Sequence, residues 1–113
     1  MKRLVGLALV GSLALAGAPA AIAKSSHPAV VRVKVKITDF KFTPTPLAIK
    51  KGNVVVWVNN GPSTHTTTSD TGKWDSGPLT VGTKFHKRFR KVGTFTYHCS
   101  IHPFMTGEID VSA

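Results

Sequence analysis

The chain has 113 residues, a length that favours a single domain. It carries 15 Lys and Arg against 5 Asp and Glu, and 42% of its residues are hydrophobic. This hydrophobic content excludes a disordered polar chain and a collagen-like repeat. The single cysteine excludes an intramolecular disulfide, and the basic charge is compatible with acidic partners or membrane surfaces.

The first 23 residues have the pattern of a secretory signal peptide. Lys2 and Arg3 precede an uncharged apolar run over residues 4–16, and small residues follow. The run is shorter than the ~20 residues that a membrane-spanning helix needs. Cleavage after Ala23 fits best and cleavage after Ala20 is the second choice, whereas an uncleaved membrane anchor is the alternative interpretation.

We therefore expect an exported protein, periplasmic or extracellular, that is not stably inserted in a membrane after cleavage. Residues 24–29 are predicted to form a flexible lead and residues 30–113 a single domain. Disulfides are permitted outside the cytoplasm, but this chain cannot form one within itself. Either the hydrophobic core suffices or a bound metal helps to hold the fold.

Alternating apolar and polar residues predict strands throughout the domain. Residues 31–37 alternate with β-branched side chains on one face, and Phe40 and Phe42 continue the apolar rhythm. Residues 54–58 are nearly all apolar and suit a strand that is covered on both faces. Further short strands are predicted, separated by Gly and Pro turns, over residues 47–49, 84–89, 94–99 and 105–111.

Residues 63–83 are predicted to be rich in loops, with Trp74, Leu79 and Val81 as apolar anchors. No segment after the signal sequence shows a convincing helical repeat of apolar residues. About seven to eight short strands with such turns indicate the all-β class and an antiparallel-rich β-sandwich.

Three side chains with affinity for soft metals follow one another at short spacing. Cys99, His102 and Met105 stand at positions i, i+3 and i+6, where a strand passes into a tight loop. Thiolate favours Cu(I), imidazole accepts either oxidation state, and a thioether adds a weak, soft ligand. The segment therefore predicts a copper site suited to transfer of single electrons.

Such a site needs a second imidazole, and the chain offers four other histidines. His98 neighbours Cys99 on a strand and so points to the opposite face. His86 lies in a basic, outward-facing segment, and His27 lies in the lead. Spacing therefore selects His65, which follows a turn after a buried strand, to join Cys99, His102 and Met105.

The segment 97–105 resembles the copper loop of the cupredoxins, the blue copper proteins. Its Cys-x-x-His-x-x-Met spacing is similar to the short loop of the amicyanins, whereas the plastocyanins and pseudoazurins have a longer spacing from His to Met. The resemblance implies a Greek-key β-sandwich with one copper ion that alternates between Cu(I) and Cu(II). It also implies a carrier of single electrons, not an enzyme.

The resemblance implies a role for each matching residue. Cys99 would be the deprotonated covalent ligand, His65 and His102 would complete a trigonal plane, and Met105 would be the weak axial ligand. The residue after the first histidine is usually Asn and ties the two ligand loops together, but here it is Thr66. Its backbone N–H can still reach the Cys99 sulfur, whereas the side-chain tie is open to question.

The family also implies how electrons enter and leave. The edge of His102 would emerge through an apolar patch, with Pro62, Pro103 and Phe104 flanking the ligand loops. The expected partner is a redox protein with an acidic docking surface, and the carrier is expected to be a monomer.

The basic segment 84–91 has two interpretations. It is a solvated face that aids solubility, or a docking patch that steers an acidic redox partner. We expect no nucleic-acid partner, because no binding motif is present.

Other functions remain open at this point. Cys99 alone has the ordinary interpretation of an inert buried thiol, and the scaffold as a whole that of a fold that has lost its metal. A module for copper sequestration or delivery would use the same ligands. A Cys–His enzyme with Cys99 as nucleophile would lack an oxyanion hole and leave Met105 without a role.

Overall fold

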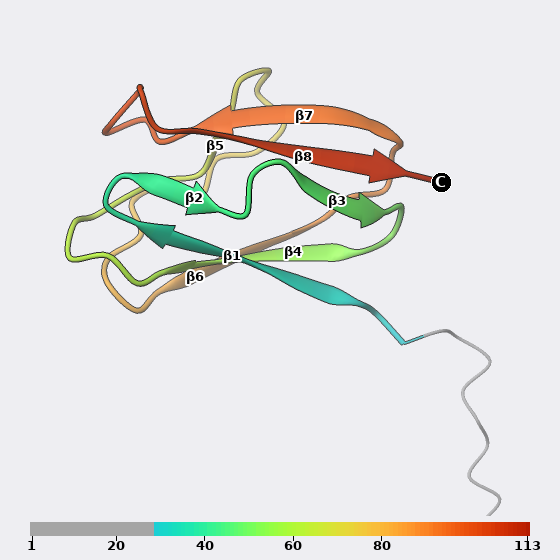
Figure 1. The fold of residues 1–113 in the computed structure, drawn as a ribbon, viewed down its shortest axis with the longest axis horizontal. Coiled ribbons are helices and arrows are strands. Elements are labelled where there is room, and N and C mark those ends of the chain that lie inside the picture. Colours follow the sequence, from blue (N-terminus) through green and yellow to red (C-terminus); the bar gives the residue numbers. More distant parts are fainter. Residues whose placement is uncertain (1–28) are drawn as a thin grey trace, which may run out of the picture.

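The computed structural model describes residues 29–113, which form eight strands in two sheets (Figure 1). Residues 1–28, which include the predicted signal peptide and most of the predicted lead, lie outside the described residues. Within residues 29–113, no helix is long and apolar enough to cross a membrane. The strands are β1 (Arg32–Thr38), β2 (Lys41–Thr43), β3 (Leu47–Lys50), β4 (Val54–Asn59), β5 (Thr68–Ser69), β6 (Lys84–Arg88), β7 (Gly93–His98) and β8 (Thr106–Ser112).

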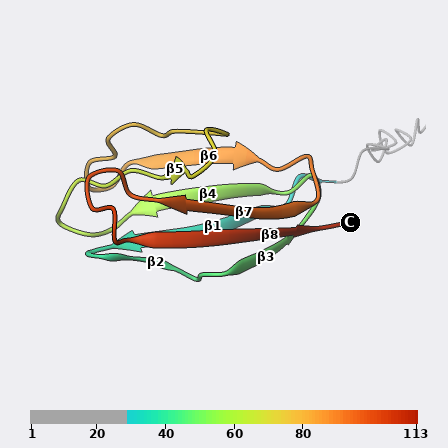
Figure 2. The same cartoon turned by 90° about the horizontal axis from the view of Figure 1, so that it is seen from above.

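The two sheets pack face to face, so the predicted all-β sandwich is confirmed. One sheet has the order β2-β1-β4-β6 and the other β3-β8-β7-β5. The β1–β4 and β3–β8 pairs are parallel, and the other four pairs are antiparallel. Strands that are neighbours in a sheet are thus mostly distant in sequence, and Figure 2 shows the two layers from above.

The core fills the space between the sheets with residues that alternate along the strands. Trp57 of β4 is fully buried and its ring lies 5.6 Å from that of Tyr97 in β7 and 5.9 Å from that of Trp74. Burying a large apolar side chain stabilises the fold by roughly 1.5–3 kcal/mol. Other buried residues with alternate spacing are Val35, Ile37, Val55, Ile109 and Val111.

Two expectations about apolar residues are wrong. Val81 is 56% exposed and does not anchor its loop, and Phe40 is 48% exposed although Phe42 is buried. Val81 lies in the turn before β6 and Phe40 in the turn between β1 and β2. Period-two alternation holds only for extended, paired backbone, so the apolar rhythm stops at Phe40. Val81, which was expected to anchor a loop, is instead exposed in its turn.

Candidate metal centre

The loop that carries His65 is organised by a buried asparagine at the end of β4. The Asn59 side-chain amide donates to the carbonyls of Ser63 (2.9 Å) and Leu79 (2.8 Å), and its oxygen accepts from the Gly61 N–H (3.0 Å). The backbone of His65 then pairs with that of Leu79 through bonds of 3.1 and 2.7 Å. These bonds fix the fully buried His65 on a loop that is not part of either sheet.

The loop that carries Cys99 and His102 begins where β7 ends. The Cys99 N–H donates to the Met105 carbonyl and the Met105 N–H donates to the His102 carbonyl, both at 2.9 Å. The segment therefore closes on itself and leads directly into β8. Cys99 and Met105 are buried, and His102 is partly exposed.

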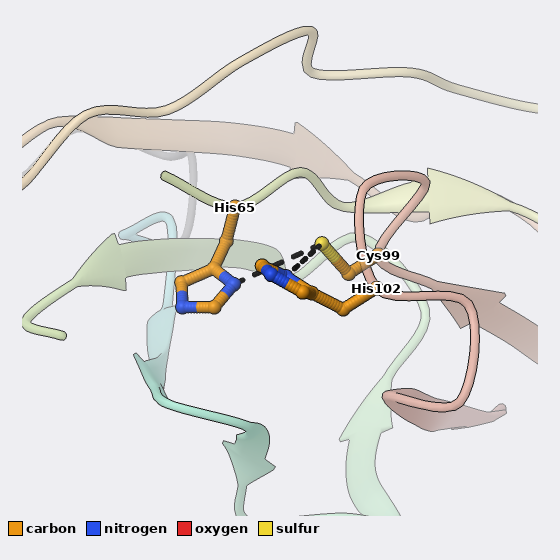
Figure 3. Close-up of side chains that lie close together, drawn as sticks. All are labelled: His65, Cys99 and His102. Carbon is orange, nitrogen blue, oxygen red and sulfur yellow. Dashed lines mark hydrogen bonds between the residues drawn. The ribbon is translucent and has the colours of Figure 1, made fainter. Parts of the chain in front are cut away.

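Three of the four predicted ligands converge on one point (Figure 3). The Cys99 Sγ atom lies 3.8 Å from Nδ1 of His65 and 3.6 Å from Nδ1 of His102. The three ligand atoms all lie within 4.8 Å of one another. His65, which lies 34 positions before Cys99, thus joins Cys99 and His102 in presenting one sulfur and two nitrogens to the same small space.

These distances fit a metal ion between the three atoms. First-row ions bind nitrogen at about 2.0 Å and sulfur at about 2.3 Å, so an angle near 120° places the two ligand atoms about 3.7 Å apart. A trigonal set of one thiolate and two imidazoles is the preferred environment of blue copper. The donor chemistry and the spacing therefore both fit copper.

Asp39, which the sequence analysis did not assign to the site, orients His65. Nε2 of His65 lies 2.7 Å from Asp39 Oδ1, and Ser63 donates to the same carboxylate from its hydroxyl (2.8 Å) and its N–H (3.3 Å). A proton on Nε2 leaves Nδ1 with a free lone pair that faces the thiol. Desolvation raises the pKa of Asp39, but the hydrogen bonds from Ser63 and His65 outweigh it and hold the pKa below its usual value.

Thr66 ties the two ligand loops together, so the open question about its side chain is answered. Its N–H donates to the Cys99 sulfur at 3.3 Å. Its hydroxyl oxygen accepts from the Ser100 N–H at 2.7 Å and lies 3.0 Å from the Ser100 hydroxyl. A threonine here therefore supplies both the bond to sulfur and the bridge between the loops.

The other predicted ligand and the histidines that were predicted not to be ligands lie in different places. The side chain of Met105 is 1% exposed within the closed loop, and its role as a ligand stays a prediction. His98 points away from the site and pairs with Asp70, and His86 is exposed on β6, both as predicted. His27 lies outside the described residues.

Two phenylalanine rings lie beside the partly exposed His102. Phe40 lies 4.9 Å from the His102 ring and Phe104 lies 6.1 Å from it, measured between ring centroids. Phe104 is 71% exposed and Ile101 is 48% exposed. Phe104 was a predicted member of an apolar patch, whereas Phe40 was missed because its turn lies about 60 residues earlier in the chain.

Known proteins with similar sequences and structures point in the same direction. The sequence model of the cupredoxin-like domain family matches residues 6–111 of this chain. Amicyanin-alpha of Methylorubrum extorquens is 32% identical, with coverage of 93% of this chain and 97% of that protein. Amicyanin of Paracoccus denitrificans is 31% identical, with coverage of 82% and 72%.

Solved structures agree with these relatives. The purple cupredoxin from Nitrosopumilus maritimus superposes with a TM-score of 0.65 at 29% identity, over 71% of this chain and 99% of that one. An oxidised methionine-to-leucine mutant of amicyanin superposes with a TM-score of 0.66 at 28% identity, over 71% and 81%. Copper is the cofactor of this family, and its amicyanin-like members carry electrons and are not enzymes. With its sandwich fold and its convergent Cys and His residues, the chain belongs to the cupredoxin-like family and within it resembles amicyanin.

Proposed function

We propose that this protein is an exported blue copper carrier of single electrons, with His65, Cys99, His102 and Met105 as its metal ligands. The observation that carries the proposal is the meeting of one thiol sulfur and two imidazole nitrogens, all within 4.8 Å, inside a fold of the cupredoxin-like family. Bound copper supplies the one-electron couple between Cu(I) and Cu(II).

The protein's own residues hold the ligands in place before metal arrives. Asp39 fixes the ring of His65, and Thr66 holds both the Cys99 sulfur and the Ser100 backbone. A site that is held by such outer bonds changes little when its charge changes. Small rearrangement is the property that a one-electron carrier requires.

Electrons are exchanged through His102, because it is the ligand that lies partly at the surface. Exposed Phe40 and Phe104 flank it and form an apolar contact area for a redox partner protein. When a partner docks on this area, water is excluded and the electron-transfer path from the partner to His102 becomes shorter. The carrier acts as a monomer outside the cytoplasm, as residues 24–113 after cleavage following Ala23, with residues 30–113 as its copper-binding domain.

Titration of the copper-free protein with Cu(II) tests this function. The proposal predicts one copper per chain and an intense visible thiolate-to-copper charge-transfer band. Cys99→Ser and His65→Ala should remove that band, whereas His86→Ala, a matched change at an exposed histidine, should keep it. A colourless product from the unaltered protein, or a band retained by Cys99→Ser, would contradict the proposal.

Copper delivery is distinguished from electron transfer by how readily the reduced protein releases its copper. A carrier keeps its copper when it is reduced in the presence of a weak Cu(I) chelator, because Cys99 and His65 are fully buried. A blue protein that gives up Cu(I) readily under these conditions would instead be a delivery module.

A further inference from the structure

The outer face of the sheet β2-β1-β4-β6 carries a regular array of Lys, Arg and His side chains around an apolar stripe. In register, Arg32 of β1 lies beside Val54 of β4, and Val54 lies beside Arg88 of β6. The two further rows of the array have the same order, with a basic residue on each side of a valine. They are Lys34, Val56 and His86, and then Lys36, Val58 and Lys84.

The three valines belong to this outer face and not to the core. Val55 and Trp57, which alternate with them along β4, are part of the core cluster, whereas Val54, Val56 and Val58 are not. Strand side chains alternate between faces, so the valines point outward together with the exposed Lys, Arg and His residues beside them. We call these nine residues the valine–cation face.

The valine side chains are nevertheless largely shielded from solvent by their neighbours. Val54 is 6% exposed and Val58 is 7% exposed, although neither is a member of the core cluster. A groove of about 410 Å³ on this sheet is lined by basic residues of β1 and β6 and by valines, namely Arg32, Lys34, Lys84, His86, Val33, Val56 and Val58. Long basic side chains that cover apolar surface in this way keep their charged ends in water.

The charge of the face is not neutralised within the described part of the chain. Over residues 29–113 the ion pairs are His65–Asp39 and His98–Asp70, and neither involves the valine–cation face. Among the described residues that line the groove, none is acidic. Like charges held about 10 Å apart across three strands repel one another, so an arrangement of this kind gains stability when an anionic partner covers it.

We propose that the valine–cation face is a docking site for an acidic protein surface, in which small apolar side chains enter the groove and carboxylates on either side pair with the flanking Lys and Arg. The apolar area around His102 is formed by Phe40 and Phe104, and none of the nine residues of the valine–cation face belongs to it. The docking site would be a second contact surface of the proposed electron carrier. Only the expectation that the partner is a redox protein rests on the proposed function.

The recessed floor favours a protein over a membrane as the partner. Binding to a bilayer surface relies on protruding Trp, Phe or Leu side chains that enter the interface. None of the described residues of this face is aromatic, and its valines lie beneath the level of the charged groups. Complementary charge with a shallow apolar groove is instead the arrangement that guides encounter between proteins.

A binding experiment with two charge-matched double variants tests the proposal. Poly-L-glutamate is the probe for an acidic polypeptide, and phosphatidylglycerol vesicles are the probe for a membrane. Lys34→Glu with Lys84→Glu changes the face, and Lys51→Glu with Lys91→Glu makes the same change of net charge at exposed turns elsewhere. Binding is followed by backbone amide NMR shifts of the copper-loaded Cu(I) protein.

The proposal predicts that poly-L-glutamate shifts the amides of β1, β4 and β6 most strongly. The Lys34/Lys84 variant should bind about tenfold more weakly, because each lost or reversed surface pair contributes a fraction of a kcal/mol. The Lys51/Lys91 variant should bind within about threefold of the unaltered protein. Equal weakening in both variants, shifts centred on another surface, or tighter binding to the vesicles than to poly-L-glutamate would overturn the proposal.

The blue colour separates this proposal from the proposed function. Both double variants should keep the full charge-transfer band, because none of the four lysines touches the ligand residues. If the band is present but the valine–cation face does not bind poly-L-glutamate, the docking proposal fails and the carrier function stands.

Discussion

Single side chains around His65 decide how its imidazole faces the thiol. The spacing of Cys99, His102 and Met105 predicted a copper loop from sequence, and elimination among the histidines selected His65. Asp39 could not be predicted in the same way, because it reaches His65 from a turn 26 residues away. Short-range spacing reveals ligands on one loop, whereas contacts between loops depend on the folded sandwich.

Replacing Asp39 with Asn tests its orienting role. The amide oxygen can still accept from Nε2 of His65, but the loss of negative charge makes the imidazole a weaker ligand. We expect copper affinity to fall about tenfold and the reduction potential to rise. Competition with a chelator and voltammetry measure these changes, with Asp75→Asn as the control for charge. An unchanged affinity and potential would show that Asp39 does not act on His65.

Replacing Pro103 with Ala tests how backbone donors near Cys99 tune the potential. Proline has no N–H and cannot donate to the sulfur, whereas alanine restores a donor. An added hydrogen bond withdraws electron density from the thiolate and favours Cu(I). The reduction potential should therefore rise, and an unchanged or lower value on voltammetry would refute this explanation.

Strand alternation predicted most of the elements because a two-sided sheet requires it. The predicted strand over residues 105–111 and the two-sided burial of β4 agree with the structure. The same reasoning failed at Phe40, which lies in a turn where alternation has no physical basis. The separate prediction that Val81 anchors a loop also failed, because its side chain is exposed. Strand order was not predicted, because pairing between distant strands depends on packing that no local pattern records.

Gly107 of β8 is required by the ring that crosses it. A Cβ atom at this position would lie within 2.5 Å of the Tyr97 hydroxyl oxygen and closer still to the ring. Tyr97 is fully buried and its ring packs against those of Phe42 and Trp57, so moving it would disturb the core. Gly107→Ala should lower the free energy of unfolding by about 3 kcal/mol.

Chemical denaturation of the Gly107→Ala variant measures this loss. Thr106→Ala changes the neighbouring exposed residue of the same strand and serves as the control. A loss of stability in the glycine variant no larger than in the control would show that the ring can shift to accept a methyl group.

The pair of Asp70 and His98, next to the end of β5, makes the free energy of unfolding depend on pH. Hydrogen bonds from His98 and Thr96 hold the pKa of Asp70 below its usual value of 3.8. A lowered folded pKa contributes stability above pH 3.8, and this stability is lost as the pH falls through the folded pKa. Because the pair is partly exposed, the contribution is at most about 1 kcal/mol.

Unfolding of the native protein and of Asp70→Asn at several pH values measures this contribution. The difference in unfolding free energy between the two proteins should be present near pH 5 and shrink below pH 3.8. Asp75→Asn removes the same charge elsewhere and corrects for general electrostatics. A difference that grows as the solution becomes more acidic would contradict the assignment.

At the scale of the whole molecule, the sandwich separates three tasks. The core between the sheets holds the fold, one end brings the two ligand loops together, and the outer face of the first sheet carries unneutralised charge. The fold class followed from composition and strand patterns. The valine–cation face did not, because its rows come from three strands whose register appears only in the folded sheet.

The location of copper in crystals of the loaded protein tests the account most directly. Anomalous diffraction at the copper edge should show one peak, within bonding distance of Sγ of Cys99 and of Nδ1 of both His65 and His102. A peak at any other group of side chains, or copper bound without contact to the Cys99 sulfur, would contradict the assignment of this centre.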